Sequence, residues 1–533
     1  MSAVSLPYKC LFLWYNVISK SSQKTIAMKK NISFLLITVV MFSQLHAQQY
    51  PLGIFDAQTE IGNAHPGNVS YNSNEQQYTI EGSGANIWAT HDGFHFLYKK
   101  MKGDFILRAN VAFIGKGAED HRKIGWMVRS SLDSTSAHVS GVVHGDGLTS
   151  LQFRSKAGDT TAEMRSDLKG AEIIQLERKG NTYIMSVAKN GDMFVTKQVD
   201  LDLGDDVYVG LFVCAHNPAV SEKAMFHNVR ITIPAWPTLV PYKDYLGSQL
   251  EILNVASGDS KIIFQSSRSL QAPNWMHDGK SLLYNSEGLL YTFNLSTLTP
   301  TVLNTGTVTH NNNDHVISFD GKMLGISSGS TADKGVSIGY VVPITGGEPK
   351  RITVTGPSYV HGWSPDGKDI VFTGQRNNEF DIYKIGANGG EETRLTTATG
   401  LDDGPEYSPD GKYIYFNSVR SGTMQIWRMK PDGSGQEQLT NDGLNNWFPH
   451  ISPDGKWIVY ITFGNDVSPS DHPFYKHVYL RLMPADGGTS KVIAYLYGGQ
   501  GTINTPSWSP DGKRLAFISN SNLLSPLYPA EKR

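Results

Sequence analysis

A short turn motif that recurs six times in the second half of the chain constrains its fold more than any other feature. Four copies read Ser-Pro-Asp-Gly-Lys, and two degenerate copies precede them, ending at Lys280 and Lys322. The spacings between successive motif aspartates are 42, 46, 44, 44 and 57 residues, counted along Asp278, Asp320, Asp366, Asp410, Asp454 and Asp511. A period near 44 residues is that of one four-stranded β-propeller blade, so the repeat predicts six blades.

The motif also predicts the order of strands within a blade. Residues before it should form the innermost strand, Pro-Asp-Gly should make a tight turn with glycine at positive φ, and a second strand should follow. Two strand-like runs, 250–254 and 261–264, precede the first motif, and little chain follows the last one. We expect these runs to complete the sixth blade, because joining the two ends in one sheet removes its exposed edges.

The best-preserved copies, such as Trp363-Ser-Pro-Asp-Gly-Lys368, carry a resemblance to a known family. They resemble the WD40-like PD40 repeat of TolB-type six-bladed propellers, over residues of about 245–525. The resemblance implies the fold and says little about activity, because one fold hosts many functions.

The first half of the mature chain predicts a second all-β unit. Residues 104–111, 125–129 and 149–154 read as short strands separated by glycine-rich turns, a pattern typical of a β-sandwich. The pattern Gly103-Asp-Phe105, Gly125-Trp-Met-Val-Arg129 and Gln152-Phe-Arg154 resembles concanavalin-like jelly rolls of the DUF1349 type, which often accompany carbohydrate-active proteins. We therefore expect a sandwich at 48–233, a proline-rich linker at 234–244 and the propeller at 245–533.

The N-terminal segment predicts export. Met28-Lys-Lys30 is followed by an apolar run, 32–42, and by Ala47, which together describe a signal peptide cleaved near Ala47, with 1–27 as an upstream extension. The alternative is a retained membrane anchor. We expect a periplasmic or secreted protein of the Gram-negative type, without stable membrane insertion after cleavage. The formal net charge of -2 argues against a nucleic-acid partner.

Strand alternation places candidate site residues on one face of the propeller. The loops between blades and those between the second and third strands should share a face, away from the motif turns. Side chains of metal-ligating type stand just before the motifs there, at His315, His361, Glu406 and His450. They predict a divalent metal site, with Mn, Ca and Zn not distinguished. The alternatives are a metal-free binding site and polar groups that only hydrogen-bond the backbone around a wet channel. Further candidates precede them, at His310, Asp314, Asp402, Asp403, Asn446, Trp447 and Asn504.

The long last spacing adds a loop to this face. About 13 extra residues fall in 463–477, and long loops on a rigid scaffold often bind ligands. We predict His361, His450, Tyr475 and Lys476 as catalytic residues. The predicted substrate-binding residues are Arg376, Arg420, Asn446, Trp447, His472 and His477. For the two arginines, a carboxylate or sulfate clamp competes with a purely structural hydrogen-bonding role.

Three functions compete at this point. A secreted protein that pairs a concanavalin-like domain with a histidine-lined propeller suggests polysaccharide breakdown. The propeller, through His361-Gly-Trp363 and its channel histidines, more distantly resembles that of oligogalacturonate lyases, which implies a histidine-bound metal and β-elimination from acidic, including sulfated, oligosaccharides by a lyase or a dehydratase. The second function is a non-catalytic module that binds a glycan or a protein, and the third is a structural partner in an envelope complex. A serine-hydrolase elbow at Gly325-Ile-Ser-Ser-Gly329 is rejected, because no helix is expected after it.

Overall fold

The computed structural model describes residues 52–523, which form strands, turns and loops. The predicted signal peptide lies outside the described residues. Within residues 52–523 no helix has the length and apolar character needed to cross a membrane. The all-β class predicted from the repeat and the short strand patterns is confirmed, because the elements between residues 52 and 523 are strands joined by turns and loops.

The first half of the described chain contains two seven-stranded antiparallel sheets. One consists, in spatial order, of β1 (Ala57–Ile61), β6 (Phe94–Met101), β15 (Val207–Cys214), β8 (Lys123–Arg129), β9 (His138–His144), β10 (Thr149–Arg154) and β11 (Ala162–Arg165). The other consists of β14 (Val195–Asp200), β13 (Thr182–Ala188), β12 (Ile173–Lys179), β7 (Phe105–Ile114), β16 (Glu222–Thr232), β3 (Gln77–Gly82) and β2 (Asn68–Asn72). A small hairpin joins β4 (Ile87–Trp88) to β5 (His91–Asp92).

One hydrophobic core is shared by these two sheets. Trp126 and Leu211 come from the first sheet, Leu107 and Leu176 come from the second, and all four are fully buried in the same cluster. Two antiparallel sheets that bury their inner faces against each other form a β-sandwich. The finer resemblance to concanavalin-like domains stays a prediction.

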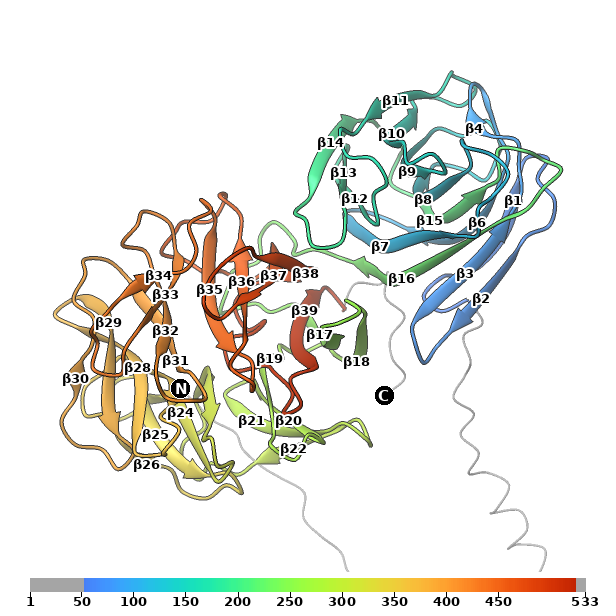
Figure 1. Cartoon of the computed structure of the whole chain (residues 1–533). Coiled ribbons are helices and arrows are strands. Elements are labelled where there is room, and N and C mark those ends of the chain that lie inside the picture. The colour runs from blue at the N-terminus through green and yellow to red at the C-terminus, as the bar shows by residue number, and fades with distance from the viewer. Residues whose placement is uncertain (1–51, 524–533) are drawn as a thin grey trace, which may run out of the picture. The chain divides into compact units, whose positions relative to one another are not determined.

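Five four-stranded sheets follow along the chain, each built in sequence order from the inside outward (Figure 1). They are β19 (Gln271–Trp275), β20 (Ser281–Ser286), β21 (Leu289–Asn294) and β22 (Thr299–Leu303); β23 (Asn311–Ile317), β24 (Met323–Ser330), β25 (Val336–Pro343) and β26 (Lys350–Arg351); β27 (Ser358–Trp363), β28 (Asp369–Arg376), β29 (Glu379–Gly386) and β30 (Thr393–Arg394); β31 (Asp402–Tyr407), β32 (Ile414–Ser418), β33 (Gln425–Met429) and β34 (Glu437–Gln438); β35 (Asn445–Ile451), β36 (Trp457–Phe463), β37 (Lys476–Pro484) and β38 (Lys491–Gly498).

The sixth blade closes the ring as the sequence predicts. Strand β39 (Arg514–Ser521) pairs with β17 (Gly247–Asn254), which pairs with β18 (Ser260–Ser266), so the two ends of the propeller segment share one sheet. A bridge between Trp508 and Leu515 supplies its innermost edge. Figure 1 shows β39 beside β17, although more than 250 residues separate them in sequence.

The repeated motif forms the turn between the first two strands of a blade. In one copy, Ser364 Oγ donates to Oδ1 of Asp366 (2.7 Å) and accepts from the amide of Asp369 (2.9 Å). Gly367 between them has φ +70°, a conformation that glycine adopts without strain. The indole Nε1 of Trp363 donates to the carbonyl of Val316 in the preceding blade (3.0 Å). The motif therefore builds the scaffold, as predicted.

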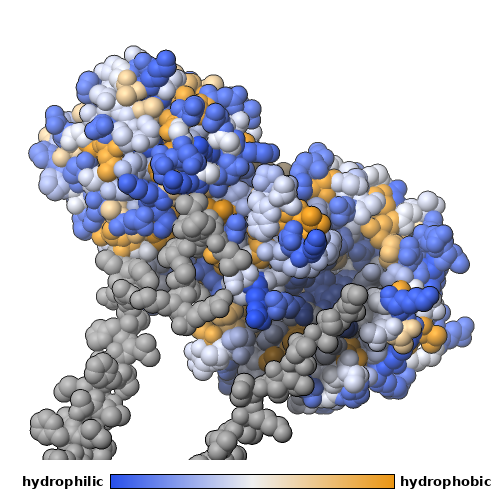
Figure 2. Space-filling model, turned by 180° about the vertical axis from the view of Figure 1, so that it is seen from behind, coloured by the Kyte–Doolittle hydropathy of each residue, from blue (hydrophilic) through white to orange (hydrophobic). Residues whose placement is uncertain are grey.

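Exposed apolar side chains are spread over the surface. In the space-filling view, orange residues occur in small groups among blue and white ones (Figure 2). Scattered apolar residues of this kind are normal on a protein surface, so they do not by themselves mark an interface.

Candidate functional site

A large cavity opens on the loop face of the propeller. Its volume is about 1550 Å³, and its lining comes from the innermost strands, the loops between blades, the loops between second and third strands, and the linker before β17. None of the motif aspartates is among the lining residues. The prediction that any site lies on the face away from the motif turns therefore agrees with the position of this cavity.

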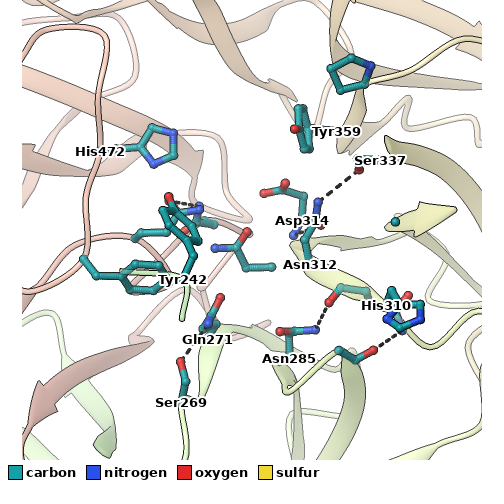
Figure 3. A pocket seen from close by; sticks show the side chains of 18 of the residues that line it. Tyr242, Ser269, Gln271, Asn285, His310, Asn312, Asp314, Ser337, Tyr359 and His472 are labelled. Atoms are coloured by element: carbon teal, nitrogen blue, oxygen red, sulfur yellow. Dashed lines mark hydrogen bonds between the residues drawn. The ribbon is translucent and has the colours of Figure 1, made fainter. Parts of the chain in front are cut away.

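A buried histidine between two carboxylates forms the charged part of the cavity. The Nε2 atom of His361 lies 3.5 Å from Oδ1 of Asp403 and 4.0 Å from Oδ1 of Asp314. These three side chains come from β27, β31 and β23, the innermost strands of three blades. In Figure 3 the carboxylate of Asp314 points into the open space that Tyr359 and His472 flank.

The two carboxylates differ in how they are held. Asp403 Oδ1 accepts hydrogen bonds from Thr373 Oγ1 and from the amide of Gly404, both at 2.7 Å. Burial would raise the pKa of Asp403, but hydrogen bonding to His361 and the charges of His361 and His472 lower it. Burial raises the pKa of Asp314 to about 6, even though His361 opposes the rise. Asp403 therefore holds the negative charge and Asp314 exchanges its proton near neutral pH.

The histidine responds to the same two neighbours. Burial lowers the pKa of His361, but the negative charges of Asp314 and Asp403 outweigh burial and raise it above the usual value. Its ring also stacks on Phe448, with centroids 6.0 Å apart. The group can thus hold and transfer a proton within the cavity.

A second histidine reaches Asp403 from the long loop. The Nε2 atom of His472 lies 3.9 Å from Oδ2 of Asp403, and its ring packs edge-on against Trp447 (4.4 Å between centroids) and Phe448 (5.2 Å). His472 is a predicted substrate-binding residue, and it does line the cavity. Its binding role stays a prediction.

β-Bulges in the innermost strands determine the direction in which these side chains point. The register shifts between Asn311 and His315, between Val360 and Gly362, and between Asp403 and Glu406. Asp314 and His361 lie within such β-bulges and Asp403 borders one. A bulge re-aims a side chain and changes which residues share a face.

The linker and the long loop together form one wall of the cavity. Tyr242 and Tyr245 of the segment before β17 pack edge-on against Phe474, with centroids 5.2 and 5.8 Å apart, and all three residues line the cavity. Beneath them the hydroxyl of Tyr475 accepts a hydrogen bond from the amide of Leu246 (2.9 Å). The predicted long loop therefore reaches the site, but Tyr475 is buried within the wall and does not face the ligand space.

The predicted metal ligands are not brought together. Nδ1 of His450 contacts Oε2 of Glu406 (2.7 Å), its Nε2 contacts the carbonyl of Ile503, and the amide of Ile451 donates to Oε1 of Glu406 (3.0 Å). This pair is satisfied by its own contacts and does not line the cavity. His315 is fully buried, and burial lowers its pKa to about 4. Of the four predicted ligands only His361 lines the cavity, so the structure does not bring the four together around one point.

The two arginines are held within their own blades. Arg376 makes a two-pronged contact with Glu392 (2.9 and 2.8 Å), and its other donors reach carbonyls and Ser358. Arg420 contacts Asp402 (2.6 Å), Ser418 (2.7 Å) and Gln436. Neither residue lines the cavity. The arrangement favours the structural alternative over the carboxylate clamp.

The other predicted catalytic and substrate-binding residues also lie outside the cavity lining, whereas four of the further candidates line it, namely His310, Asp314, Asp403 and Asn504. Asn446 is buried, donates to Gln425 (3.2 Å) and accepts from Thr462 (2.7 Å). Trp447 is fully buried behind His472, and Lys476 Nζ pairs with Asp466 (3.0 Å). His477 lies at the start of β37 with its side chain half exposed.

Sequence reasoning gave too little weight to several polar residues of the lining. Asp314 and Asp403 stand farther from the motif than the chosen positions, and the run Asn311–Asn313 was not singled out. The available signal was the dense polar run Asn311–Asp314 before an apolar strand end. Burying polar side chains costs free energy unless they form hydrogen bonds or bind a ligand.

The ligand atoms that converge most closely lie elsewhere. Across residues 52–523, one group of His, Cys, Asp or Glu residues offers three ligand atoms within 4.8 Å of one another, namely His121, His144 and Asp146 of the sandwich. The propeller histidines and carboxylates do not meet this criterion.

Comparisons with known proteins agree with the fold of the second half. The family model described as the TolB beta propeller domain, PD40, matches residues 340–472. An uncharacterized protein of Agrobacterium fabrum is 47% identical over 272 residues, which cover 51% of this chain and 92% of that protein. A solved TolB candidate from Agrobacterium tumefaciens is 46% identical, covers 52% of this chain and 99% of its own, and has a TM-score of 0.50. TolB from Acinetobacter baumannii is 18% identical, covers 61% of this chain and 79% of its own, and has a TM-score of 0.38.

Proposed function

Because the chain belongs to the TolB-type β-propeller family, we propose that the loop-face cavity of its propeller is a binding site for a polar, hydroxyl-rich ligand, best an oligosaccharide. The fold alone does not specify a ligand, since one propeller architecture serves many functions. The proposal therefore depends on the side chains that line the cavity.

The lining combines carboxamides with aromatic rings, and this combination is the observation that carries the proposal. A carboxamide both donates and accepts hydrogen bonds, which suits sugar hydroxyls, and an aromatic ring can cover the apolar face of a sugar. The carboxamides are Gln271, Asn285, Asn311, Asn312, Asn313, Gln500 and Asn504, and the rings include Tyr242, Tyr245, Tyr359 and Phe474. Most ligand pockets carry only a few polar groups, so the many carboxamides of this lining favour a ligand rich in hydroxyl groups.

The charges of the cavity favour a neutral sugar or an amino sugar. Asp314 and Asp403 lie deep in it, and Arg268 at its edge pairs with Glu287 (3.1 Å). Arg376 and Arg420 are occupied by their own partners. A ligand carboxylate would meet the carboxylates of Asp314 and Asp403, whose negative charge His361 and His472 only partly offset, so acidic oligosaccharides should bind less well than neutral ones.

Elimination chemistry is kept as a second candidate because the group around His361 can exchange a proton. In this reaction a base removes the proton from C5 of a uronate, the electron pair forms the C4–C5 double bond, and the group on C4 leaves with a proton from an acid. A departing sugar makes the enzyme a lyase and a departing hydroxyl makes it a dehydratase. His361 and Asp314 are the residues we assign to the proton transfers.

We assign no metal ion to the propeller residues in this proposal. Their ligand atoms do not converge, because His450 and Glu406 bind each other and His315 is enclosed in the core. We also propose an exported, periplasmic or secreted protein, on the basis of the sequence at 28–47 and the family relationship.

Calorimetric titration of the purified protein tests the binding proposal. The ligands are matched neutral, amino and uronate oligosaccharides, and we expect the neutral or amino series to bind and the uronates to bind more weakly. Tyr359→Phe and Asp403→Asn should weaken binding, whereas Asp466→Asn, at an exposed carboxylate outside the cavity, should not. The proposal fails if none of the series binds, or if Asp466→Asn weakens binding as much as Asp403→Asn does.

The same oligouronates test the second candidate by absorbance in the unsaturated-uronate band. Growth of the band that disappears in His361→Gln would support elimination. If absorbance does not rise with any oligouronate while neutral sugars bind measurably, the elimination candidate is contradicted and the binding function is supported.

A further inference from the structure

Three neighbouring strands of the sandwich bring several histidines to one end of a sheet. Strand β8 lies between β15 and β9, and the register pairs Lys123 with both Cys214 and His144. His121 stands two residues before Lys123, and His216 stands two residues after Cys214. The antiparallel register therefore gathers His121, His144 and His216 at the same sheet end.

The side chains at this sheet end are close enough to share one ion. His121, His144 and Asp146 each offer one ligand atom, and the three atoms lie within 4.8 Å of one another. The ring of His216 lies 5.5 Å from that of His121 between centroids. Ligands bound to one Zn²⁺ at about 2.1 Å lie roughly 3.4 Å apart, so modest side-chain rotations would complete a tetrahedral site.

The backbone around these residues is already fixed. The amide of Asp146 donates to the carbonyl of Asp120 (2.8 Å), and that of Gly145 donates to the carbonyl of Arg122 (3.0 Å). These bonds hold the β9–β10 turn against the segment that leads into β8. The amide of Leu148 donates to Oδ1 of Asp146 (2.9 Å) and thereby holds the carboxylate in place.

At this sheet end two buried ring nitrogens have no hydrogen-bond partner among residues 52–523. They are Nδ1 of His144 and Nδ1 of His216, and His144 is only 5% exposed. A buried polar atom without a partner is costly and calls for an explanation. A bound metal ion would satisfy both nitrogens.

A neighbouring amide can set the correct tautomer of His144. Its Nε2 lies 3.2 Å from the carboxamide of Gln152, whose oxygen and nitrogen can exchange places by rotation. With the oxygen facing His144, Nε2–H donates to it and the lone pair stays on Nδ1. Metal-binding histidines are typically oriented by such an outer hydrogen bond.

We infer that this sheet end is a site for one divalent transition-metal ion of the Zn²⁺ class, bound by His121, His144 and Asp146 with His216 as the fourth ligand. Imidazoles with one carboxylate suit Zn²⁺ and its neighbours better than Ca²⁺ or Mg²⁺, which prefer oxygen ligands. The ion would join the segment before β8, the β9–β10 turn and the segment after β15. This site is independent of the propeller cavity and of the proposed function.

Metal content and affinity of the whole protein test the site. After removal of metals and addition of Zn²⁺ alone, we expect one equivalent to remain after desalting and the melting temperature to rise with Zn²⁺ concentration. His121→Ala and Asp146→Asn change exposed side chains, so the protein should still fold and lose this equivalent. His91→Ala, at an exposed histidine outside the group, is the matched control and should bind as the wild type does.

Two further variants separate a designed site from chance binding. His216→Asn keeps a residue that tolerates the left-handed φ of +60° there, and it should weaken Zn²⁺ binding if His216 is a ligand. Gln152→Leu should weaken binding by roughly 10- to 100-fold if the amide orients His144. The inference is overturned if the wild type retains no Zn²⁺ at micromolar concentration, or if His121→Ala and Asp146→Asn bind as tightly as His91→Ala.

Discussion

The Nε2 atom of His361 lies 3.5 Å from Oδ1 of Asp403 inside the propeller cavity. The contact stabilises the negative charge of Asp403, which also accepts hydrogen bonds from Thr373 and Gly404. Asp314, on the other side of the same imidazole, lies farther away at 4.0 Å. The imidazole of His361 therefore interacts more strongly with Asp403 than with Asp314. The pKa values of the two carboxyl groups differ as a result, so that Asp403 is charged and Asp314 titrates near neutral pH.

The stability of the propeller should fall as pH rises through the titration of Asp314. Its pKa is about 6 in the folded protein against 3.8 as a free side chain, so the folded state binds more protons than the unfolded state between these values. The free energy of unfolding then decreases with pH over that interval. We expect Asp314→Asn to remove this decrease, with a gain over the wild type of up to about 3 kcal/mol at pH 8 relative to pH 4.

Calorimetric melting of both proteins across this pH range measures the difference. Comparing the variant with the wild type at each pH cancels the packing effect of the substitution, which does not depend on pH. Asp466→Asn, at an exposed carboxylate, is the control. Parallel melting curves for Asp314→Asn and the wild type at all pH values would contradict the raised pKa of Asp314.

Ligand binding should depend on the same proton. Protonated Asp314 donates a hydrogen bond, whereas the carboxylate only accepts one, so affinity for a neutral oligosaccharide should change severalfold between pH 5 and pH 7, as expected for a group titrating near 6. In Asp314→Asn the affinity should be flat over this range. Titration calorimetry at several pH values measures it, and a pH dependence that survives the substitution would assign the effect to another group.

The repeat made the fold predictable, and irregularities in the repeat made the site difficult to predict. A turn motif of fixed period specifies blades directly, and closure by β17 and β39 follows from removing a sheet edge. The side chains near the motif were assigned by counting back along a regular strand. The bulges around Asp314 and His361 break that count, which therefore favours Glu406 and His450 as metal ligands over the further candidates Asp314 and Asp403, the two that line the cavity.

Partners in space were the other missing information. Residue types alone could not show that Arg376 forms an ion pair with Glu392, or that the hydroxyl of Tyr475 accepts a hydrogen bond from the amide of Leu246. The histidines of the sandwich went unnoticed for the same reason. His121, His144 and His216 are far apart in sequence, and only the pairing of β8 with β9 and β15 brings them together.

The motif turns should contribute to stability without affecting the cavity. Gly367 has φ +70°, and an added Cβ would meet no atom within 4 Å, so Gly367→Ala should cost about 1 kcal/mol through backbone strain alone. Gly464→Ala is the control, because its φ is not in the left-handed region and its Cβ would meet only the movable end of Asp466. Chemical denaturation measures both variants. An equal loss in the two would show that strain at the turn is not the cause.

Arg376 should act on stability and leave ligand affinity unchanged. Its side chain is 14% exposed and that of Glu392 is 20% exposed, so Arg376→Ala leaves a largely buried carboxylate without its partner and should cost about 2–3 kcal/mol. Lys476→Ala removes a cation from a more exposed pair with Asp466 and should cost less than about 1 kcal/mol. Both residues stand outside the cavity lining, so oligosaccharide affinity measured well below the melting temperature should match the wild type in both. A fivefold or larger loss of affinity in Arg376→Ala, with an unchanged melting temperature, would instead support the carboxylate-clamp role of Arg376.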